Sequence, residues 1–187
     1  MEIYLIRHTK TIAQAGLCYG QTDLDVMDDF LVEAKAIKEK LSELTTDVKI
    51  YSSPLQRCKK LAAYFSPHFL IDERLQELHF GDWENCLFDD LPYKDLEYWT
   101  ANFVEIAPPN GERFLDLIAR VELFWKMLIT QNAQTVFIFT HAGTIRALLA
   151  IILKLPPKNT FQFAIDYSSV HKLRYCDNYT HILYLNQ

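Results

Sequence analysis

The sequence contains little glycine and no long apolar segment. Only five of its 187 residues are glycine, and neither a P-loop nor a GxGxxG motif occurs, which argues against the usual phosphate loops for nucleoside triphosphates and dinucleotides. The longest apolar run, residues 147–153, falls short of a membrane span, and the apolar residues at the start are too few for a signal peptide. We therefore expect a cytoplasmic protein with no membrane partner.

Cysteines are few and widely separated. The sequence has four, Cys18, Cys58, Cys86 and Cys176, and none of them forms a CxxC or CxxH pair. This spacing argues against a zinc knuckle and against a dithiol redox motif. A chain of this length buries enough apolar surface to fold without disulfide bonds, so we expect free thiols.

Basic residues are outnumbered by acidic ones. Lys and Arg total 19 against 24 Asp and Glu, and the formal net charge is −5. Nucleic-acid binding depends mainly on basic side chains that neutralise phosphates. The excess of acidic residues therefore argues against a nucleic-acid partner. The sequence leaves open whether the protein is a monomer or a homodimer.

Strand and helix patterns alternate along the chain. Short apolar or β-branched runs predict strands at residues 3–6, 48–51, 135–140, 161–165, 170–175 and 181–185. Apolar residues at helical spacing predict helices at residues 27–44, after Gly111-Glu112 with an apolar stripe from Phe114 to Leu128, and from Gly143 to Leu153. A further helix is predicted with Ser53 as its N-cap and Pro54 at its first position.

This alternation predicts the fold class. We expect an α/β three-layer sandwich, in which a mostly parallel sheet carries helices on both faces. Residues 1–187 are then a single domain. An irregular helical excursion at about residues 78–110, rich in aromatic and acidic side chains, is expected to cover part of a site.

Basic side chains follow three of the predicted strands. Arg7 and His8 follow the first strand, Arg57 follows the second, and His141 follows residues 135–140. Ligands of open α/β sheets bind outside the carboxyl ends of the strands, where helix N-termini also favour anions. Arginine matches phosphate oxygens with planar, paired donors. These residues therefore predict a phosphate pocket.

Four blocks of the sequence resemble a known family. They read Leu-Ile-Arg-His-Thr at 5–9, Ser-Ser-Pro-Leu-Gln-Arg-Cys at 52–58, Leu-Gln-Glu-Leu-His-Phe-Gly-Asp-Trp-Glu at 75–84 and Thr-His-Ala-Gly-Thr-Ile-Arg at 140–146. In this order they resemble the histidine phosphatase superfamily, the phosphoglycerate-mutase-like proteins. The resemblance spans nearly the whole chain and implies the phosphoglycerate-mutase-like fold. It also implies a metal-independent phosphomonoesterase without a cofactor.

The resemblance implies roles for individual residues. His8 is expected to be the nucleophile that takes the phosphoryl group as a phosphohistidine. Arg7, Arg57 and His141 are expected to bind the phosphate, and Glu77 to protonate the leaving oxygen and then activate water. The chemistry of the residues agrees, because neutral imidazole is a competent nucleophile and phosphoryl transfer depends mainly on positioning and electrostatics.

Substrate contacts are also expected from Gln14, Gly20, Gln21 and Ala142. Residues 16–23, Gly-Leu-Cys-Tyr-Gly-Gln-Thr-Asp, resemble a loop of the family's α-ribazole-5′-phosphate phosphatases, which serve cobalamin biosynthesis. The expected partner is accordingly a small-molecule phosphomonoester, with α-ribazole 5′-phosphate as a candidate.

Three other interpretations stay open. A phosphoglycerate mutase would use the same residues, although mutases of the family resemble longer chains with additional closing segments. A non-catalytic phosphate-binding module on the same fold would lack the nucleophile or the acid, and this sequence has both. A histidine-based metal site would need familiar ligand spacings, which the sequence does not contain.

Residues outside this set have simpler expected roles. Arg146, one turn into its helix, is expected in a structural ion pair. The other basic side chains expected at the surface or in turns are Arg74, Arg113, His68, His171 and His181. The aromatic side chains that fit either a substrate pocket or the core are Trp83, Trp99 and Phe103.

Overall fold

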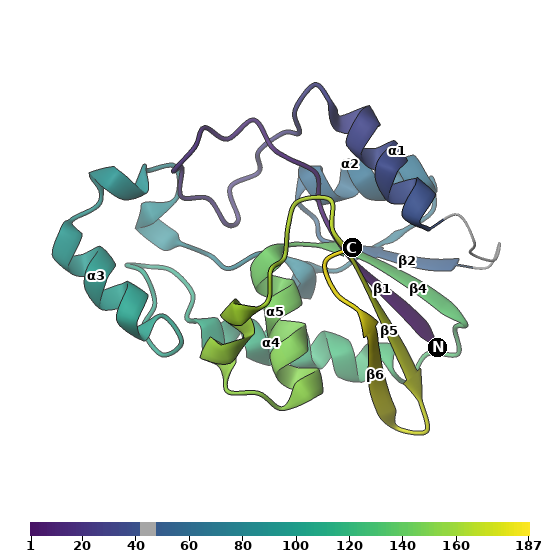
Figure 1. The fold of residues 1–187 in the computed structure, drawn as a ribbon. Helices are drawn as coiled ribbons and strands as arrows, with labels where there is room; N and C mark the ends of the chain where they lie inside the picture. The colour runs from purple at the N-terminus through teal and green to yellow at the C-terminus, as the bar shows by residue number, and fades with distance from the viewer. Residues whose placement is uncertain (42–47) are drawn as a thin grey trace.

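A six-stranded sheet forms the centre of the protein, with strand order β3-β2-β4-β1-β5-β6. The computed structural model describes residues 1–41 and 48–187 (Figure 1). The strands are β1 (Glu2–Arg7), β2 (Val48–Ser52), β3 (Leu70–Ile71), β4 (Thr135–Thr140), β5 (Val170–Cys176) and β6 (Tyr179–Tyr184). The first four are parallel, and β5 and β6 add an antiparallel hairpin beside β1. The predicted, mostly parallel sheet is confirmed.

Helices cover both faces of the sheet (Figure 1). They are α1 (Phe30–Lys40) and α2 (Gln56–Phe65) on one face, and α4 (Phe114–Leu128) and α5 (Ala142–Leu153) on the other. No helix in the described ranges is both long enough and apolar enough to cross a membrane. Because helices lie on both faces of the sheet, the predicted three-layer α/β sandwich is confirmed.

The central strands explain why two separate cores form. Ile3 and Leu5 of β1 pack in the core with α4 and α5, whereas Tyr4 and Ile6 pack in the core with α1 and α2. Successive strand residues point to opposite faces, so one strand supplies both cores. All residues of β4 are buried, as expected for a strand covered on both sides.

Between β3 and α4 the chain makes an excursion of short helices. These are η1 (Glu73–Leu75), η2 (Gly81–Trp83), η3 (Phe88–Asp90) and α3 (Tyr93–Asn102). α3 lies away from the sheet (Figure 1) and has no buried residue. Trp99 packs against Phe80, Trp83 and Phe103, and Phe103 packs against Phe114 at the start of α4. This aromatic series attaches the excursion to the rest of the molecule.

The predicted strand at 161–165 is wrong. The chain there forms the 3-10 helix η4 (Pro157–Gln162), followed by an irregular segment. Phe161 packs against Phe103 and Phe114, with ring centroids 4.5 and 5.2 Å apart. The apolar pattern of this segment therefore reflects packing beneath the excursion and not pairing in the sheet.

Helix boundaries also differ from the prediction. α1 begins at Phe30, not at residue 27, and its predicted end at residue 44 lies outside the described residues. α2 begins at Gln56, with Leu55 and not Ser53 as its N-cap. The Ser53 hydroxyl instead lies 2.8 Å from a ring nitrogen of His141, because β2 and β4 end side by side.

Candidate active site

His8 and His141 follow two neighbouring parallel strands, β1 and β4. Arg7 at the end of β1 is the register partner of Thr140 at the end of β4. His8 and His141 come next, and their rings are 5.1 Å apart between centroids. The His8 amide donates to the Thr140 carbonyl at 3.1 Å, which extends the pairing into the site.

His8 is held as a neutral imidazole with one free ring nitrogen. Its side chain is 2% exposed, and its Nδ1 lies 2.7 Å from the Thr9 carbonyl. Because a carbonyl only accepts, Nδ1 carries the proton, and Nε2 keeps its lone pair. Burial, together with the charges of Arg57 and Arg7, lowers the pKa of His8 well below its ordinary value of 6.5.

His141 is buried behind His8 and faces protein groups with both ring nitrogens. Arg57 donates from Nε to His141 Nδ1 at 3.3 Å, and so the ring proton lies on Nε2, which donates to the Ser53 hydroxyl at 2.8 Å. Burial and the charge of Arg57 lower the pKa of His141 well below its ordinary value. His141 therefore orients Arg57 in this structure.

The Arg57 guanidinium is fixed by carbonyl groups. Although it is fully buried, it has no carboxylate partner in the described part of the chain. Nη1 donates to the Thr22 carbonyl at 2.7 Å, and Nη2 donates to the Gly20 carbonyl. Carbonyl oxygens orient the guanidinium without cancelling its charge, so Arg57 stays available to an anion.

The Arg7 guanidinium likewise has no carboxylate partner in the described ranges. Nη1 donates to the Ile165 carbonyl at 2.7 Å, and Nε is buried without a partner in the described ranges. The Tyr167 ring covers the guanidinium, with its centroid 3.7 Å from Cζ. The Tyr167 hydroxyl lies 2.7 Å from that of Tyr19, whose ring centroid is 5.3 Å from Cζ of Arg57.

A carboxylate from the excursion organises the loop that holds Arg57. Glu84 accepts hydrogen bonds from the amides of Gly20, Gln21, Thr22 and Phe80 at 2.9–3.0 Å, and another from the Thr22 hydroxyl. Burial raises the pKa of Glu84, but these donors outweigh burial and hold the pKa below its ordinary value. The amides of Gly20 and Gln21 are therefore engaged by Glu84.

Glu77 reaches the cavity beside the start of α5. The Gly143 amide donates to its Oε2 and the Leu78 amide to its Oε1, both at 2.9 Å. A Cβ at Gly143 would overlap the Glu77 carboxylate, so this position requires glycine for the close approach. The carboxylate thus lies at the positive end of α5.

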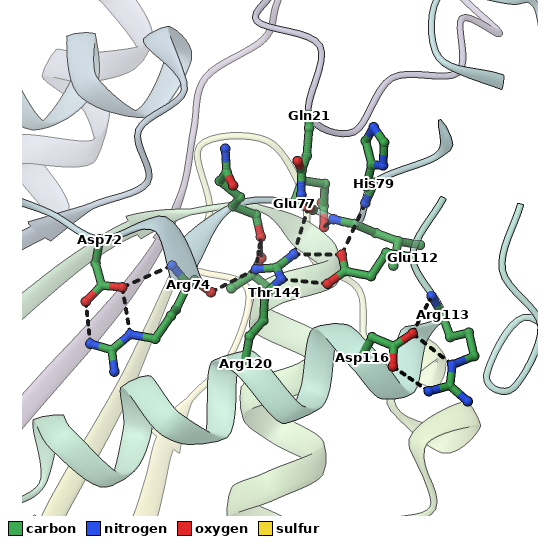
Figure 2. A network of polar contacts seen from close by, with 12 residues as sticks. Gln21, Asp72, Arg74, Glu77, His79, Glu112, Arg113, Asp116, Arg120 and Thr144 are labelled. Atoms are coloured by element: carbon green, nitrogen blue, oxygen red, sulfur yellow. Dashed lines mark hydrogen bonds and ion pairs between the residues drawn. The ribbon is translucent and has the colours of Figure 1, made fainter. Parts of the chain in front are cut away.

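The backbone before Glu77 is anchored by the two helices beneath it (Figure 2). Arg120 of α4 donates to the carbonyls of Arg74, Gln76 and Glu77 at 2.8–2.9 Å. The Thr144 hydroxyl of α5 donates to the Gln76 carbonyl at 2.7 Å. These contacts hold the Glu77 backbone in place.

These groups surround a cavity of about 430 Å³. Its charged lining residues are Arg7, Arg57, Arg146 and Glu77, so cations outnumber anions in a protein of net negative charge. Aromatic side chains form most of the remaining wall, and they are Tyr19, Phe80, Phe88, Trp99, Phe103, Phe114, Phe161 and Tyr167. A second hollow of about 600 Å³ at the other end of β2 and β4 has neither arginine nor carboxylate among its described lining residues. Arg7 and Arg57, which the sequence predicts to bind phosphate, line the first cavity and not the second.

The structure brings most of the predicted site residues together. Arg7, His8, Arg57, Glu77 and Ala142 line the cavity, and His141 lies directly behind it.

The remaining predicted contacts lie elsewhere. Gln14 is exposed and does not line the cavity. Gly20 and Gln21 act through the loop: the Gly20 carbonyl holds Arg57, and the Gln21 amide side chain donates to the Glu77 carbonyl at 3.1 Å.

Sequence reasoning missed several residues. Tyr19 lies in the loop at 16–23, but nothing in the sequence pointed to Tyr167. Trp99 and Phe103 line the cavity, whereas Trp83 is buried and belongs to the aromatic packing around it. Arg146 was predicted in an ion pair, yet it has no carboxylate within 4.0 Å in the described ranges and lines the cavity.

The surface assignment of His171 is also wrong. This residue is fully buried in β5, and its ring accepts from the Asn186 amide and contacts the Ser169 hydroxyl. Burial lowers the pKa of His171 to about 4. By contrast, His68 and His181 are exposed as predicted. Arg113 is exposed, whereas Arg74 is partly buried by its pair with Asp72.

Comparison with known proteins finds phosphatases among the relatives of this chain. The chain is 28% identical to the adenosylcobalamin/α-ribazole phosphatase of Salmonella typhimurium, over 100% of this chain and 96% of that protein. It is 31% identical to a metal-independent phosphoserine phosphatase of Arabidopsis thaliana, over 79% of this chain and 66% of that protein. The crystal structure of the α-ribazole phosphatase from Shigella flexneri superposes with a TM-score of 0.91 at 26% identity, over 100% of this chain and 96% of the other.

A family model describes the chain from residue 3 to its end. The model is that of the histidine phosphatase superfamily, branch 1, and it matches residues 3–187. The matched range contains His8, His141, Arg7, Arg57 and Glu77. The chain therefore belongs to branch 1 of the histidine phosphatase superfamily, as the four sequence blocks predicted.

Proposed function

We propose that this phosphatase hydrolyses phosphomonoesters through a phosphohistidine on His8, and that its substrate is α-ribazole 5′-phosphate. The observation that carries the reaction is the Nε2 lone pair of His8. It lies in a cavity with Arg7 and Arg57, two arginines that have no carboxylate partner in the described part of the chain. A neutral imidazole is the nucleophilic form, and the lowered pKa of His8 keeps it available.

In the first step His8 Nε2 attacks the phosphorus atom, and the bond from phosphorus to the ester oxygen breaks. Arg7 and Arg57 stabilise the charge on the phosphoryl oxygens, which is the main requirement of phosphoryl transfer. Glu77, in its protonated form, donates a proton to the departing oxygen. The products of this step are the free alcohol and phosphohistidine.

In the second step water attacks the phosphorus atom of the phosphohistidine. Glu77, now a carboxylate, removes a proton from that water, and the nitrogen–phosphorus bond breaks. His8 returns to the neutral imidazole, and inorganic phosphate leaves. The role of His141 in both steps is to hold Arg57 through Nδ1, because its two ring nitrogens already have protein partners.

The aromatic wall of the cavity supports a substrate whose alcohol portion carries an aromatic ring. Phe80, Phe103 and Trp99 lie on the excursion side of the cavity, away from the basic strand ends. α-Ribazole 5′-phosphate is a nucleotide with a dimethylbenzimidazole base, which suits offset or edge-to-face stacking on such rings. Relatives named for this substrate align over the whole of the present chain.

The nucleophile is tested by rapid quenching with radiolabelled substrate. We expect an acid-labile, base-stable label on His8, and His8→Ala should abolish both the label and turnover while the circular dichroism spectrum stays unchanged. His68→Ala, a change of an exposed histidine far from the cavity, serves as the matched control. Label on another residue, or turnover within tenfold of the parent in His8→Ala, would contradict the proposal.

The substrate is tested by phosphate release from a panel of phosphomonoesters. We expect a higher kcat/KM for α-ribazole 5′-phosphate than for phosphoserine or 3-phosphoglycerate, because only the first places an aromatic ring against the cavity wall. Equal kcat/KM values for the three esters would contradict α-ribazole 5′-phosphate as the substrate. They would leave the proposed reaction through phosphohistidine unaffected. Transfer of the phosphoryl group to a second hydroxyl of 3-phosphoglycerate in preference to water would support the mutase instead.

A further inference from the structure

The seven arginines of the chain fall into two groups. Four of them form an ion pair with a carboxylate, and all four lie outside the active-site cavity: Arg74, Arg113, Arg120 and Arg174. The other three have no carboxylate within 4.0 Å in the described ranges, and all three line the cavity: Arg7, Arg57 and Arg146. The first two of these have a role in the proposed reaction, and Arg146 has none.

Of these three arginines, Arg146 has the weakest hydrogen bonding to the described part of the protein. Its Nε is buried and has no hydrogen-bond partner among the described residues. The one hydrogen bond that its side chain makes within the described ranges runs from Nη2 to the Phe163 carbonyl at 3.4 Å, near the limit for such a bond. One face of the guanidinium is supported by the Phe161 ring, whose centroid lies 4.9 Å from Cζ.

Arg146 is partly buried, and this partial desolvation changes its pKa. Burial lowers that pKa, and the positive charge of Arg7 lowers it further, whereas Glu77 raises it. The guanidinium nevertheless keeps its charge, because arginine is not deprotonated in proteins. In the described ranges Arg146 lacks a carboxylate partner that would offset its desolvation.

The position of Arg146 indicates what it contacts. It follows Gly143 by about one turn of α5, and the Gly143 amide holds the Glu77 carboxylate. Arg146 therefore lies on the same side of the cavity as the group that protonates the leaving oxygen, between Glu77 and the aromatic wall at Phe161. The alcohol portion of a substrate bound beside Glu77 therefore shares a cavity with this guanidinium.

We infer that Arg146 is a specificity-determining residue that binds an oxygen acceptor on the alcohol portion of the substrate, close to the ester oxygen. The chemical class is a sugar or hydroxy-acid phosphate, whose hydroxyl, ether or carboxylate oxygen accepts from the free guanidinium N–H groups. In α-ribazole 5′-phosphate the acceptor is an oxygen of the ribose. The inference rests on the proposed function, because it assumes that the phosphoryl group lies at His8.

The kinetic test compares esters that differ in oxygen content. Ribose 5-phosphate offers sugar oxygens, 3-phosphoglycerate offers a carboxylate, and benzyl phosphate has a primary alkoxide leaving group with no further oxygen. Arg146→Met keeps the length and the contact with Phe161 but removes the donors. We expect kcat/KM to fall by about 10- to 100-fold for the two oxygen-rich esters, as for the loss of a hydrogen bond to a charged group.

For benzyl phosphate the same substitution should change kcat/KM by less than about threefold. A larger loss for 3-phosphoglycerate than for ribose 5-phosphate identifies a carboxylate as the preferred acceptor, and similar losses identify a hydroxyl or ether oxygen. Arg146→Lys should recover part of the loss, and Arg113→Met, which removes an exposed arginine, should leave all three values unchanged. Equal losses for the three esters, or no loss for any, would overturn the inference.

A binding test separates this inference from the proposed reaction. In isothermal titration, the parent should bind 3-phosphonopropanoate more tightly than propylphosphonate, which lacks the carboxylate, and Arg146→Met should remove the difference. Inorganic phosphate should bind both proteins equally, which shows that the phosphoryl half of the cavity is intact. If the parent hydrolyses none of the esters but this difference appears, the proposed function fails and the role of Arg146 stands. If hydrolysis proceeds and the parent binds both phosphonates equally, the role of Arg146 fails alone.

Discussion

Replacement of Glu84 by glutamine tests whether one carboxylate stabilises the loop that positions Arg57. Oε1 of Glu84 accepts from the amides of Gln21 and Phe80, and Oε2 accepts from the amides of Gly20 and Thr22 and from the Thr22 hydroxyl. Glutamine has one oxygen and one NH₂ group in these places. Whichever way its amide is turned, two backbone N–H groups lose their acceptor and face a donor.

The magnitude follows from counting those amides. A buried donor left unsatisfied costs about 1–3 kcal/mol, so two of them cost about 2–6 kcal/mol. Glu84 is half-buried, and water reaches part of the site. We therefore expect Glu84→Gln to lower the free energy of unfolding at pH 7 by about 2–4 kcal/mol. Because the carbonyls of Gly20 and Thr22 hold Arg57, kcat/KM should also fall by about tenfold or more.

The stability difference should depend on pH in one direction. The hydrogen bonds of folded Glu84 hold its pKa below the ordinary value of 4.5, so its carboxylate stabilises the fold fully above that pH. The contribution is lost as the pH falls through the folded pKa, because a protonated carboxyl resembles the glutamine amide. The parent and Glu84→Gln should therefore converge in stability as the pH falls below 4.5 and through the lowered pKa of folded Glu84.

The assay is urea unfolding of both proteins at a series of pH values, followed by tryptophan fluorescence. Glu105→Gln, the same change at an exposed glutamate, is the matched control and should change the free energy of unfolding by less than about 0.5 kcal/mol. A loss of under about 1 kcal/mol in Glu84→Gln at pH 7, or a loss that stays constant at low pH, would refute the reasoning.

Four further outcomes are expected. Glu77→Gln should slow the phosphoenzyme burst by about 10²–10⁴-fold on an alkyl phosphate but much less on p-nitrophenyl phosphate, whose leaving group is stable as an anion; equal losses would assign the acid elsewhere. Activity should survive exhaustive dialysis against EDTA, because arginines supply the positive charge, and a loss that zinc or magnesium restores would favour the metal site. Gly143→Ala should reduce kcat by displacing Glu77 while it leaves the thermal midpoint almost unchanged, since alanine favours helix; unchanged kcat would show that the carboxylate tolerates the shift. In an NMR titration His8 should still be neutral at pH 6.5, because its pKa lies well below that value, and a midpoint near 6.5 would contradict the assigned environment.

Residues next to the central strands could be predicted because local sequence controls their position. β1 and β4 are continuous apolar runs buried on both faces, so their ends can be located from hydrophobicity alone. The residue after a parallel strand lies at the ligand-binding edge of the sheet. Arg7, His8 and His141 therefore needed no information about distant parts of the chain.

The roles of Glu84 and Arg146 depend on partners that sequence spacing does not reveal. Glu84 organises a loop that is distant in the chain, and only the folded excursion brings the two together. Arg146 was expected to find a carboxylate, as most arginines in this chain do, and the direction of its helix places it on the cavity wall instead. Both outcomes are set by tertiary packing.

Short apolar segments were the least predictable elements of the fold. Residues 161–165 have the composition of a strand, and the same side chains suit the wall of a cavity. Phe161 lies against Phe103 and Phe114, so burial is satisfied without strand pairing. β3 has only two residues, too few for any periodic pattern to be recognised.

The placement of β1 has a consequence for the order in which the chain can fold. β1 pairs with β4 on one side and with β5 on the other, and both of these strands come from the last third of the sequence. During synthesis from the N-terminus, the first strand therefore stays unpaired until most of the chain has left the ribosome. Pairing over such sequence separations requires closure of a long loop and is slow. Because His8 and His141 meet only through this strand pair, catalytic competence should be among the last properties that a refolding molecule recovers.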